Sequence, residues 1–137
     1  MKMKPLFKLW LYAAGMLLLT EGCFSDPTKS RTTTIVGTVI DNDTKLPVEN
    51  NEIAIWGNNG VLAFKGIKLK TVFTDKDGKY SAVIDVPQNY HSLNLDNIFN
   101  VYKHRDFLLL LDGKQTNFCC PVQVGSKTQY DFIMLPK

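Results

Sequence analysis

The chain has 137 residues, 45% of them apolar and 21% charged, which suits one globular domain. Three of its 16 basic residues and one of its 13 acidic residues precede Cys23, which leaves 13 against 12, a net charge of +1, for the remainder. Nucleic-acid binding needs a basic surface that displaces counterions from phosphates, so this charge balance excludes a nucleic acid as the partner.

Residues 1–22 have the organisation of a secretory signal peptide. Met1–Lys8 is basic, Leu9–Leu19 is apolar, and Gly22 is a small residue at the expected cleavage point. Eleven apolar residues in a helix rise only about 16 Å, whereas a membrane crossing needs about 20 residues. A helical signal peptide is therefore favoured over a permanent span.

Gly22-Cys23 resembles the end of a lipobox, in which a small residue precedes the cysteine that receives the lipid. Thr20 and Glu21 depart from the usual residues, so cleavage without lipidation remains an alternative. A lipoprotein cysteine carries more than one acyl chain (palmitate is a common one), which makes anchoring stable. We expect a lipid at Cys23 to hold the chain in the outer membrane or at the cell surface, with the periplasmic face as an alternative.

Residues 23–31 form a polar tether, and residues 32–137 are expected to form the folded domain. This domain has short segments rich in β-branched residues, separated by turns rich in Asp, Asn, Gly and Pro. The pattern predicts an all-β fold of seven or eight strands, either a sandwich or a barrel. Strands are expected over Thr32–Ile40, Ile53–Trp56, Lys68–Thr74, Tyr80–Val86, Phe99–Lys103, Phe107–Leu111, Thr116–Val122 and Thr128–Leu135, and a polar connection over Gln88–Asn97.

Four motifs follow one another along the first half of the domain: Ile35-x-Gly37-x-Val39-x-Asp41, Pro47-Val48, Ile53-x-Ile55 and Thr74-Asp75-x-Asp77-Gly78-x-Tyr80. Together they resemble the carboxypeptidase regulatory-like domain, and Tyr130–Leu135 is similar to the last strand of that family. The resemblance implies an immunoglobulin- or transthyretin-like sandwich on an exported bacterial protein.

Two glycines in these motifs have a physical role. Gly37 is expected to let two strands approach closely, and Gly78 to adopt a positive φ in a turn. Asn50 stands where the family usually has glycine, and the resemblance does not cover Gln88–Val124.

No catalytic or metal site emerges from the residue types. The two histidines, His91 and His104, have no Glu at zinc-ligand spacing, and the carboxylates of Asp75 and Asp77 are better explained as turn formers than as calcium ligands. We therefore predict that the chain is not an enzyme and has no cofactor or metal.

Cys119 and Cys120 are adjacent in sequence. Because neighbouring Cα atoms are about 3.8 Å apart, below the usual disulfide range, two unbridged thiols are expected. A strained vicinal disulfide, a metal site and intermolecular pairing are the alternatives.

The predicted function is that of a membrane-anchored, non-catalytic interaction module of the adhesion type, with a protein or a glycan as partner. The alternative is a carbohydrate-binding module of a surface glycan-uptake system. Aromatic side chains stack on sugars, and Trp56, Tyr90 and Tyr102 are the candidates for stacking, although most aromatic residues of a sandwich belong to its core.

Overall fold

The computed structural model describes residues 29–60 and 66–137, so the signal peptide and Cys23 lie outside the described range. The described residues form strands and no helix, and no helix in this range has the length and apolar character required to cross a membrane. The strands are β1 (Thr32–Asp41), β2 (Glu52–Asn58), β3 (Ile67–Phe73), β4 (Lys79–Asp85), β5 (Ser92–Ile98), β6 (His104–Leu111), β7 (Lys114–Thr116), β8 (Pro121–Val122) and β9 (Lys127–Pro136).

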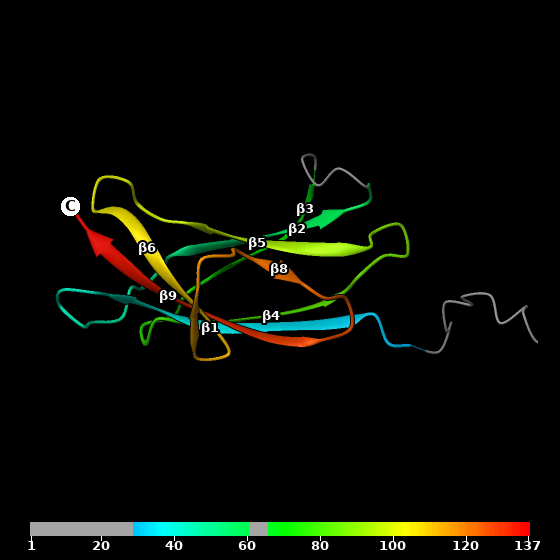
Figure 1. Ribbon diagram of the computed structural model, residues 1–137, viewed down its shortest axis with the longest axis horizontal. Helices are drawn as coiled ribbons and strands as arrows, with labels where there is room; N and C mark the ends of the chain where they lie inside the picture. Colours follow the sequence, from blue (N-terminus) through cyan, green and yellow to red (C-terminus); the bar gives the residue numbers. More distant parts are fainter. Residues whose placement is uncertain (1–28, 61–65) are drawn as a thin grey trace, which may run out of the picture.

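The strands make two sheets that pack face to face (Figure 1). One has five strands in the order β4-β1-β9-β6-β7, and the other has four in the order β3-β2-β5-β8. All neighbouring pairs are antiparallel except β1 and β9, which run parallel. The all-β sandwich expected from the sequence is confirmed.

The core lies between the sheets and is built by alternation along the strands. In β4, Tyr80 and Ala82 are buried while Ser81 and Val83 are exposed, as the sequence pattern predicted. The largest fully buried side chains include Tyr130, Phe132 and Met134 of β9, which lie opposite Ile53 and Ile55 of β2 and Leu93 of β5.

The connection expected over Gln88–Asn97 is wrong, because Ser92–Ile98 forms β5 in the middle of the four-stranded sheet. Leu93 and Leu95 point inward, but the third inward position is Asn97, which masks the alternation. Asn97 is buried because its carbonyl accepts a hydrogen bond from Asn51 (2.7 Å) and its amide reaches the sulfur of Met134 (3.4 Å).

Two further strand predictions need correction. Phe99–Lys103 is a turn between β5 and β6, and the strand expected over Thr116–Val122 is divided into β7 and β8.

The strand β3 has an irregular pairing with β2. A register shift opposite Ile55 and Trp56 separates Leu69, which packs against the core, from Phe73, which is exposed.

One end of the sandwich adjoins the tether, and the other end is remote from it. β1 begins at Thr32 beside the tether, and we call this the tether end (Figure 1). At the other end, β1 finishes at Asp41, close to His104 and to the start of β4. This remote end consists of residues 42–51, 74–78 and 99–103 and the C-terminal Lys137.

Candidate functional site

The pairing of β1 with β9 is interrupted at Gly37 and Thr38. Thr38 turns to the carboxylate of Asp131 instead, donating both its backbone N–H (2.8 Å) and its hydroxyl (2.9 Å). A side chain at Gly37 would collide with the backbone carbonyl of Tyr130, and that carbonyl accepts the hydroxyl of Tyr80 at 2.6 Å. The close approach expected at Gly37 is confirmed.

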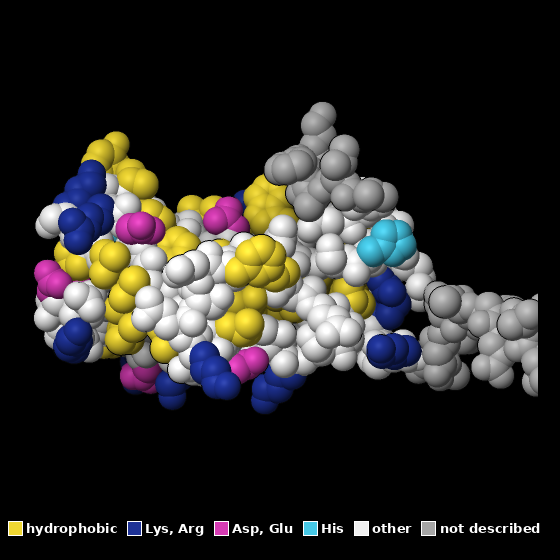
Figure 2. All heavy atoms as spheres, in the orientation of Figure 1, with side chains coloured by type: hydrophobic (Ala, Val, Ile, Leu, Met, Phe, Trp, Pro, Cys, Tyr) yellow, Lys and Arg dark blue, Asp and Glu magenta, His cyan; other side chains and the backbone are white. Residues whose placement is uncertain are grey.

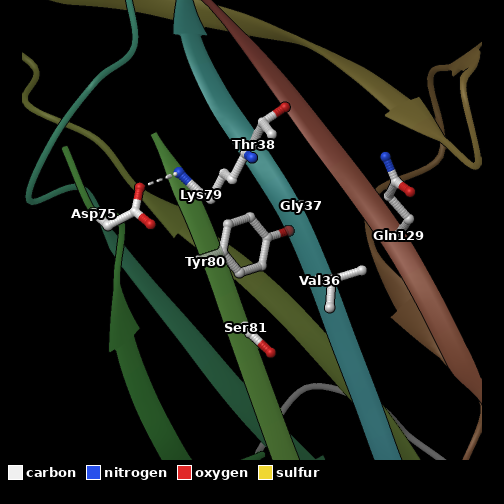
Figure 3. A pocket seen from close by; sticks show the side chains of 8 residues that line it. All are labelled: Val36, Gly37, Thr38, Asp75, Lys79, Tyr80, Ser81 and Gln129. Atoms are coloured by element: carbon white, nitrogen blue, oxygen red, sulfur yellow. Dashed lines mark hydrogen bonds between the residues drawn. The ribbon is translucent and has the colours of Figure 1, made fainter. Parts of the chain in front are cut away.

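A hollow of about 370 Å³ lies over this interruption (Figure 3). It is lined by Val36, Gly37, Thr38, Asp75, Lys79, Tyr80, Ser81 and Gln129. The carboxylate of Asp75 accepts the backbone N–H groups of Asp77 and Lys79 at 2.9 Å each, and Gly78 has a φ of +70°. These contacts stabilise the turn itself. The hollow therefore results from the way the chain folds at this point.

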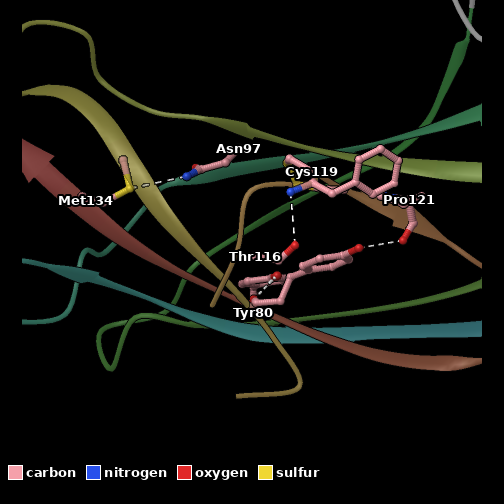
Figure 4. The surroundings of a disulfide bond; sticks show 9 residues. Tyr80, Asn97, Thr116, Cys119, Pro121 and Met134 are labelled. Carbon is pink, nitrogen blue, oxygen red and sulfur yellow. Dashed lines mark hydrogen bonds between the residues drawn. A yellow bond between two sulfur atoms is a disulfide. The ribbon is translucent and has the colours of Figure 1, made fainter. Parts of the chain in front are cut away.

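Cys119 and Cys120 form a disulfide bond, so the expectation of two unbridged thiols is wrong (Figure 4). The peptide between them is cis, and their Cα atoms are 3.1 Å apart rather than the 3.8 Å assumed for a trans peptide. Cys120 is buried, and its carbonyl accepts the N–H of Leu95 at 3.0 Å. The hydroxyl of Tyr130 donates to the carbonyl of Pro121 at 2.7 Å, which fixes the far side of the same loop.

The three candidate stacking residues lie in different places. Tyr90 is only 7% exposed and packs over Gly57 inside the sandwich, whereas Tyr102 is 88% exposed at the remote end. Trp56 is half-buried in β2, and the ammonium of Lys68 lies 5.4 Å from the centre of its ring. The structure does not bring these residues together into one platform.

Trp56 belongs to the outer face of the four-stranded sheet. Across the strands it lies in a row with Asn94 and Lys68, while Glu52 lies in a row with Ile98 and Phe73 at the remote end. Lys68 reaches Glu52 at 3.6 Å. Ala54 lies between Trp56 and Glu52 on the same face of β2 and is fully buried beneath this bridge.

The two histidines have opposite environments. His91 is exposed at the tether end, where its backbone N–H donates to the carbonyl of Asn58. His104 is 5% exposed at the remote end, with Nε2 3.4 Å from the carboxylate of Asp41. Its Nδ1 is buried and has no hydrogen-bond partner within the described part of the chain.

The carboxylate of Asp41 is held by its own turn. The backbone N–H of Thr44 lowers the pKa of Asp41 most; burial opposes this effect, and the N–H of Asp43, the Thr44 hydroxyl and His104 add to it. The Asp43 and Thr44 N–H groups lie 2.9 Å from the same carboxylate oxygen. Asp41 therefore presents an ionised acceptor to His104.

His104 lines a groove of about 310 Å³ at the remote end. We call this the remote groove, and its lining combines amide, carboxylate and ammonium groups with apolar side chains. Its other residues are Val48, Glu49, Asn50, Asn51, Glu52, Phe73, Ile98, Phe99, Asn100 and Lys103. Apolar and charged side chains lie next to each other at this end of the molecule (left in Figure 2).

The remote groove was not expected from the sequence. His104 has no Glu at zinc-ligand spacing, and the carboxylate that contacts it, Asp41, belongs to another strand. Residues 29–60 and 66–137 contain no group of three or more His, Cys, Asp or Glu side chains arranged to hold a metal ion. The polar side chains that line the groove offer hydrogen-bond donors and acceptors.

No family model and no curated protein matches this sequence. Among solved structures, the chain is similar to the shaft pilin SpaA from Lactobacillus rhamnosus GG (8% identity, TM-score 0.45), covering 80% of this chain and 52% of the pilin. This chain is also similar to a 9R-lipoxygenase from Cyanothece PCC8801 (13% identity, TM-score 0.40), covering 93% of this chain and 20% of the enzyme.

A third similar structure is the dioxygenase domain of a dioxygenase–carbohydrate-binding protein fusion from Streptomyces sp. SirexAA-E. Its identity is 12% and its TM-score 0.41, over 82% of this chain and 85% of that domain. The chain thus spans a fifth of the lipoxygenase and about half of the pilin.

The prediction that the chain is not an enzyme is corrected by these comparisons, because two of the structures named above come from enzymes. At TM-scores of 0.40 and 0.41, neither likeness assigns an activity to this chain. What the structure establishes is a β-sandwich module.

Proposed function

We propose that this chain is a lipid-anchored recognition module of the adhesion type, with a sandwich of the carboxypeptidase regulatory-like kind. Its lipid would be attached at Cys23 and would hold it in the outer membrane or at the cell surface. The support for the anchor is the order of basic, apolar and small residues before Cys23. The observation that carries the recognition role is the difference between the two ends of the sandwich.

The tether end is fastened to the sandwich by Arg31. Its guanidinium donates to the backbone carbonyls of Val86 (2.9 Å) and Pro87 (3.0 Å) and also to that of Tyr90. A planar guanidinium that holds three carbonyls fixes the direction in which the chain leaves the sandwich. A module anchored through this segment turns its remote end away from the membrane.

The remote end carries most of the exposed apolar surface. Of the eight large apolar side chains that are exposed in the described residues, Leu46, Val101 and Tyr102 lie there. Two more, Phe73 and Ile98, are the last residues of the strands β3 and β5, which lead into this end. Exposed apolar groups that gather at one place, rimmed by polar residues, are typical of binding surfaces.

The anchor is tested by metabolic labelling with a palmitate analogue in cells that express the wild type or Cys23→Ser. Cys119→Ser is the control, because it removes a different cysteine. The proposal expects label in the wild type and in the control, in the outer-membrane fraction, and none in Cys23→Ser. Label in all three variants, or in none, would contradict it.

A second candidate function is carbohydrate binding in a surface glycan-uptake system. The observation in its favour is the outer face of the four-stranded sheet, where the row of Trp56 and the row of Glu52 lead to the remote groove. An aromatic ring flanked by amides and carboxylates suits a glycan chain. Loss of glycan binding in Trp56→Ala, with retention in Tyr102→Ala, would assign stacking to this face.

A further inference from the structure

The strand β7 covers only the last part of β6. The two strands pair at residues 109–111 of β6, whereas β6 itself begins at His104. After Thr116 the chain leaves the five-stranded sheet and crosses to β8 in the other sheet (Figure 4). The first half of β6 therefore has no described strand beside it on the side opposite β9.

The backbone of Phe107 faces this uncovered side. Leu111 and Lys114 close a two-residue turn between β6 and β7, so their backbone groups are hydrogen-bonded to each other. Because backbone groups point to alternate sides along a strand, those of Leu109 and Phe107 face the same side as those of Leu111. Leu109 meets Thr116 of β7 there, but Phe107 lies beyond the end of that strand.

The backbone N–H of Phe107 is covered by a neighbouring side chain. It donates to the carboxylate of Asp106 at 2.8 Å, and Asp106 is exposed. At the opposite edge of the same sheet, the ammonium of Lys70 donates to the carbonyl of Val83 in β4 at 2.9 Å. Charged side chains are a common means of blocking an edge strand. The block at β6 is a side chain that can rotate away.

A hollow of about 250 Å³ lies along this part of β6, and we call it the edge hollow. Residues 106–109 of β6 form one wall, and the other wall consists of Gln115, Thr116, Asn117 and Cys119. Small-molecule sites usually begin at roughly 300 Å³. A smaller hollow, walled by four successive residues of one strand, suits an extended peptide that lies beside that strand.

The loop between β7 and β8 presents an aromatic ring next to the edge hollow. Phe118 is 72% exposed, and its neighbours Asn117 and Cys119 both line the hollow. The loop is held by the disulfide between Cys119 and Cys120 and by the N–H of Phe118, which donates to the hydroxyl of Thr116 at 3.1 Å. Aromatic side chains in a fixed position are typical anchors of protein interfaces.

The charge of the edge hollow restricts the ligand further. Asp106 is the only charged side chain in its lining, and it makes no ion pair within the described part of the chain. A basic side chain is therefore favoured beside it. Because Phe107 packs against the core, Asp106 projects from the outer face of the sheet, whereas the loop of Phe118 leads to the inner side. A peptide with alternating basic and apolar residues matches both sides.

We propose that the open edge of β6 binds an extended segment of a partner protein, which adds a strand to the sheet. The N–H of Phe107 turns from Asp106 to a carbonyl of the peptide, and the carbonyl of Phe107 accepts a peptide N–H. A basic side chain of the peptide pairs with Asp106, and an apolar one packs against Phe118. This surface shares no lining residue with the remote groove, so it goes beyond the recognition role proposed above.

The experiment uses the full-length lipidated chain, labelled with ¹⁵N, in a non-ionic detergent. A heptapeptide of alternating lysine and valine is titrated, and the control peptide has glutamate in place of lysine. The expected result is a saturable shift of the Phe107 amide resonance with the lysine peptide and weaker binding of the glutamate peptide. The amide of Val83, at the opposite edge, should not move.

Methylation of the peptide backbone tests strand addition itself. One version is N-methylated at every lysine and the other at every valine. Only alternate N–H groups of an added strand face its neighbour, so one version should lose binding and the other should retain it. Binding through side chains alone would leave the two versions equal.

Two variants of the protein test the side-chain contacts. Asp106→Asn keeps an acceptor for the N–H of Phe107 but removes the charge, so the dissociation constant of the lysine peptide should rise about twofold to fivefold. Phe118→Ala should raise it about fivefold or more. Phe73→Ala is the matched control, because it removes a 58% exposed ring from β3 and should leave binding unchanged.

Several outcomes would overturn the proposal. These are no shift at Phe107, equal binding of the lysine and glutamate peptides, equal behaviour of the two methylated versions, or equal effects of Phe118→Ala and Phe73→Ala. A shift at Phe107 that follows protein concentration without peptide would assign the edge to a second copy and would also overturn it. None of these results affects palmitate labelling at Cys23, so the anchor succeeds or fails separately.

Discussion

The hydroxyl of Tyr80 in β4 donates a hydrogen bond to the backbone carbonyl of Tyr130 in β9, across the position where Gly37 of β1 has no side chain. One side chain thus connects two strands that are not neighbours, because β1 lies between them. This contact gives a physical reason for the spacing of Gly37 and Tyr80 in the sequence motifs. The glycine leaves the gap, and the tyrosine fills it.

Tyr80→Phe should lower the free energy of unfolding by about 1 to 3 kcal/mol, because the buried carbonyl of Tyr130 loses its donor. The aromatic ring remains, so the loss reports the hydroxyl alone. Tyr102→Phe, which alters an 88% exposed hydroxyl, is the control and should change nothing measurable. Chemical denaturation of the three proteins decides the matter, and equal stabilities would show that the hydrogen bond contributes nothing.

The same hydroxyl makes stability depend on alkaline pH. Burial, together with the negative charge of Asp131, raises the pKa of Tyr80 far above its ordinary value of 10.0. The unfolded chain ionises at this tyrosine above pH 10.0, while the folded chain keeps it neutral. The stability that Tyr80 contributes is therefore complete below pH 10.0 and is lost as the pH rises above it.

Between pH 9 and pH 11, the free energy of unfolding of Tyr80→Phe should accordingly fall less steeply with pH than that of the wild type. The two slopes should differ by the amount expected for the release of about one proton on unfolding. Some alkaline slope should remain, because burial also raises the pKa of Tyr130. Parallel slopes for the two proteins would contradict this assignment.

Gly78→Ala should destabilise the sandwich more than Gly113→Ala. Both glycines have a positive φ, of 70° and 80°, so both substitutions carry a backbone cost of about 1 kcal/mol. A Cβ at Gly78 would also lie 2.5 Å from the carbonyl of Val39, whereas nothing lies within 4 Å of one at Gly113. The difference in thermal unfolding between the two variants isolates this collision, and similar midpoints would place the turn elsewhere.

Because Cys119 and Cys120 are bonded to each other, the chain should have no free thiol once Cys23 carries its lipid. Intact mass measurement after alkylation of the unfolded protein should find no added label before reduction and two labels after it, at Cys119 and Cys120. Two labels before reduction would return these residues to the unbridged state that the sequence suggested.

Features that depend on neighbours in sequence were predictable. Gly78 and Asp75 follow from turn chemistry, and the inward positions of β4 follow from simple alternation. β5 was missed because a polar residue, Asn97, occupies an inward position. Its burial is compensated by a hydrogen bond from Asn51, which is far away in sequence.

The remote groove was missed for a related reason. His104 becomes notable only when Asp41 lies beside it, and Asp41 reads in the sequence as an ordinary turn residue. No periodicity or spacing connects the two, because the pairing of β6 with β9 and of β9 with β1 brings them together.

The orientation of the sandwich on the membrane is the central claim, and energy transfer measures it most directly. The full chain, lipidated at Cys23, is placed in vesicles with an acceptor dye on the lipid headgroups. A donor dye is attached to Tyr102→Cys at the remote end or to His91→Cys at the tether end, without reductant. The account predicts clearly weaker transfer from position 102 than from position 91, and equal or stronger transfer from position 102 would contradict it.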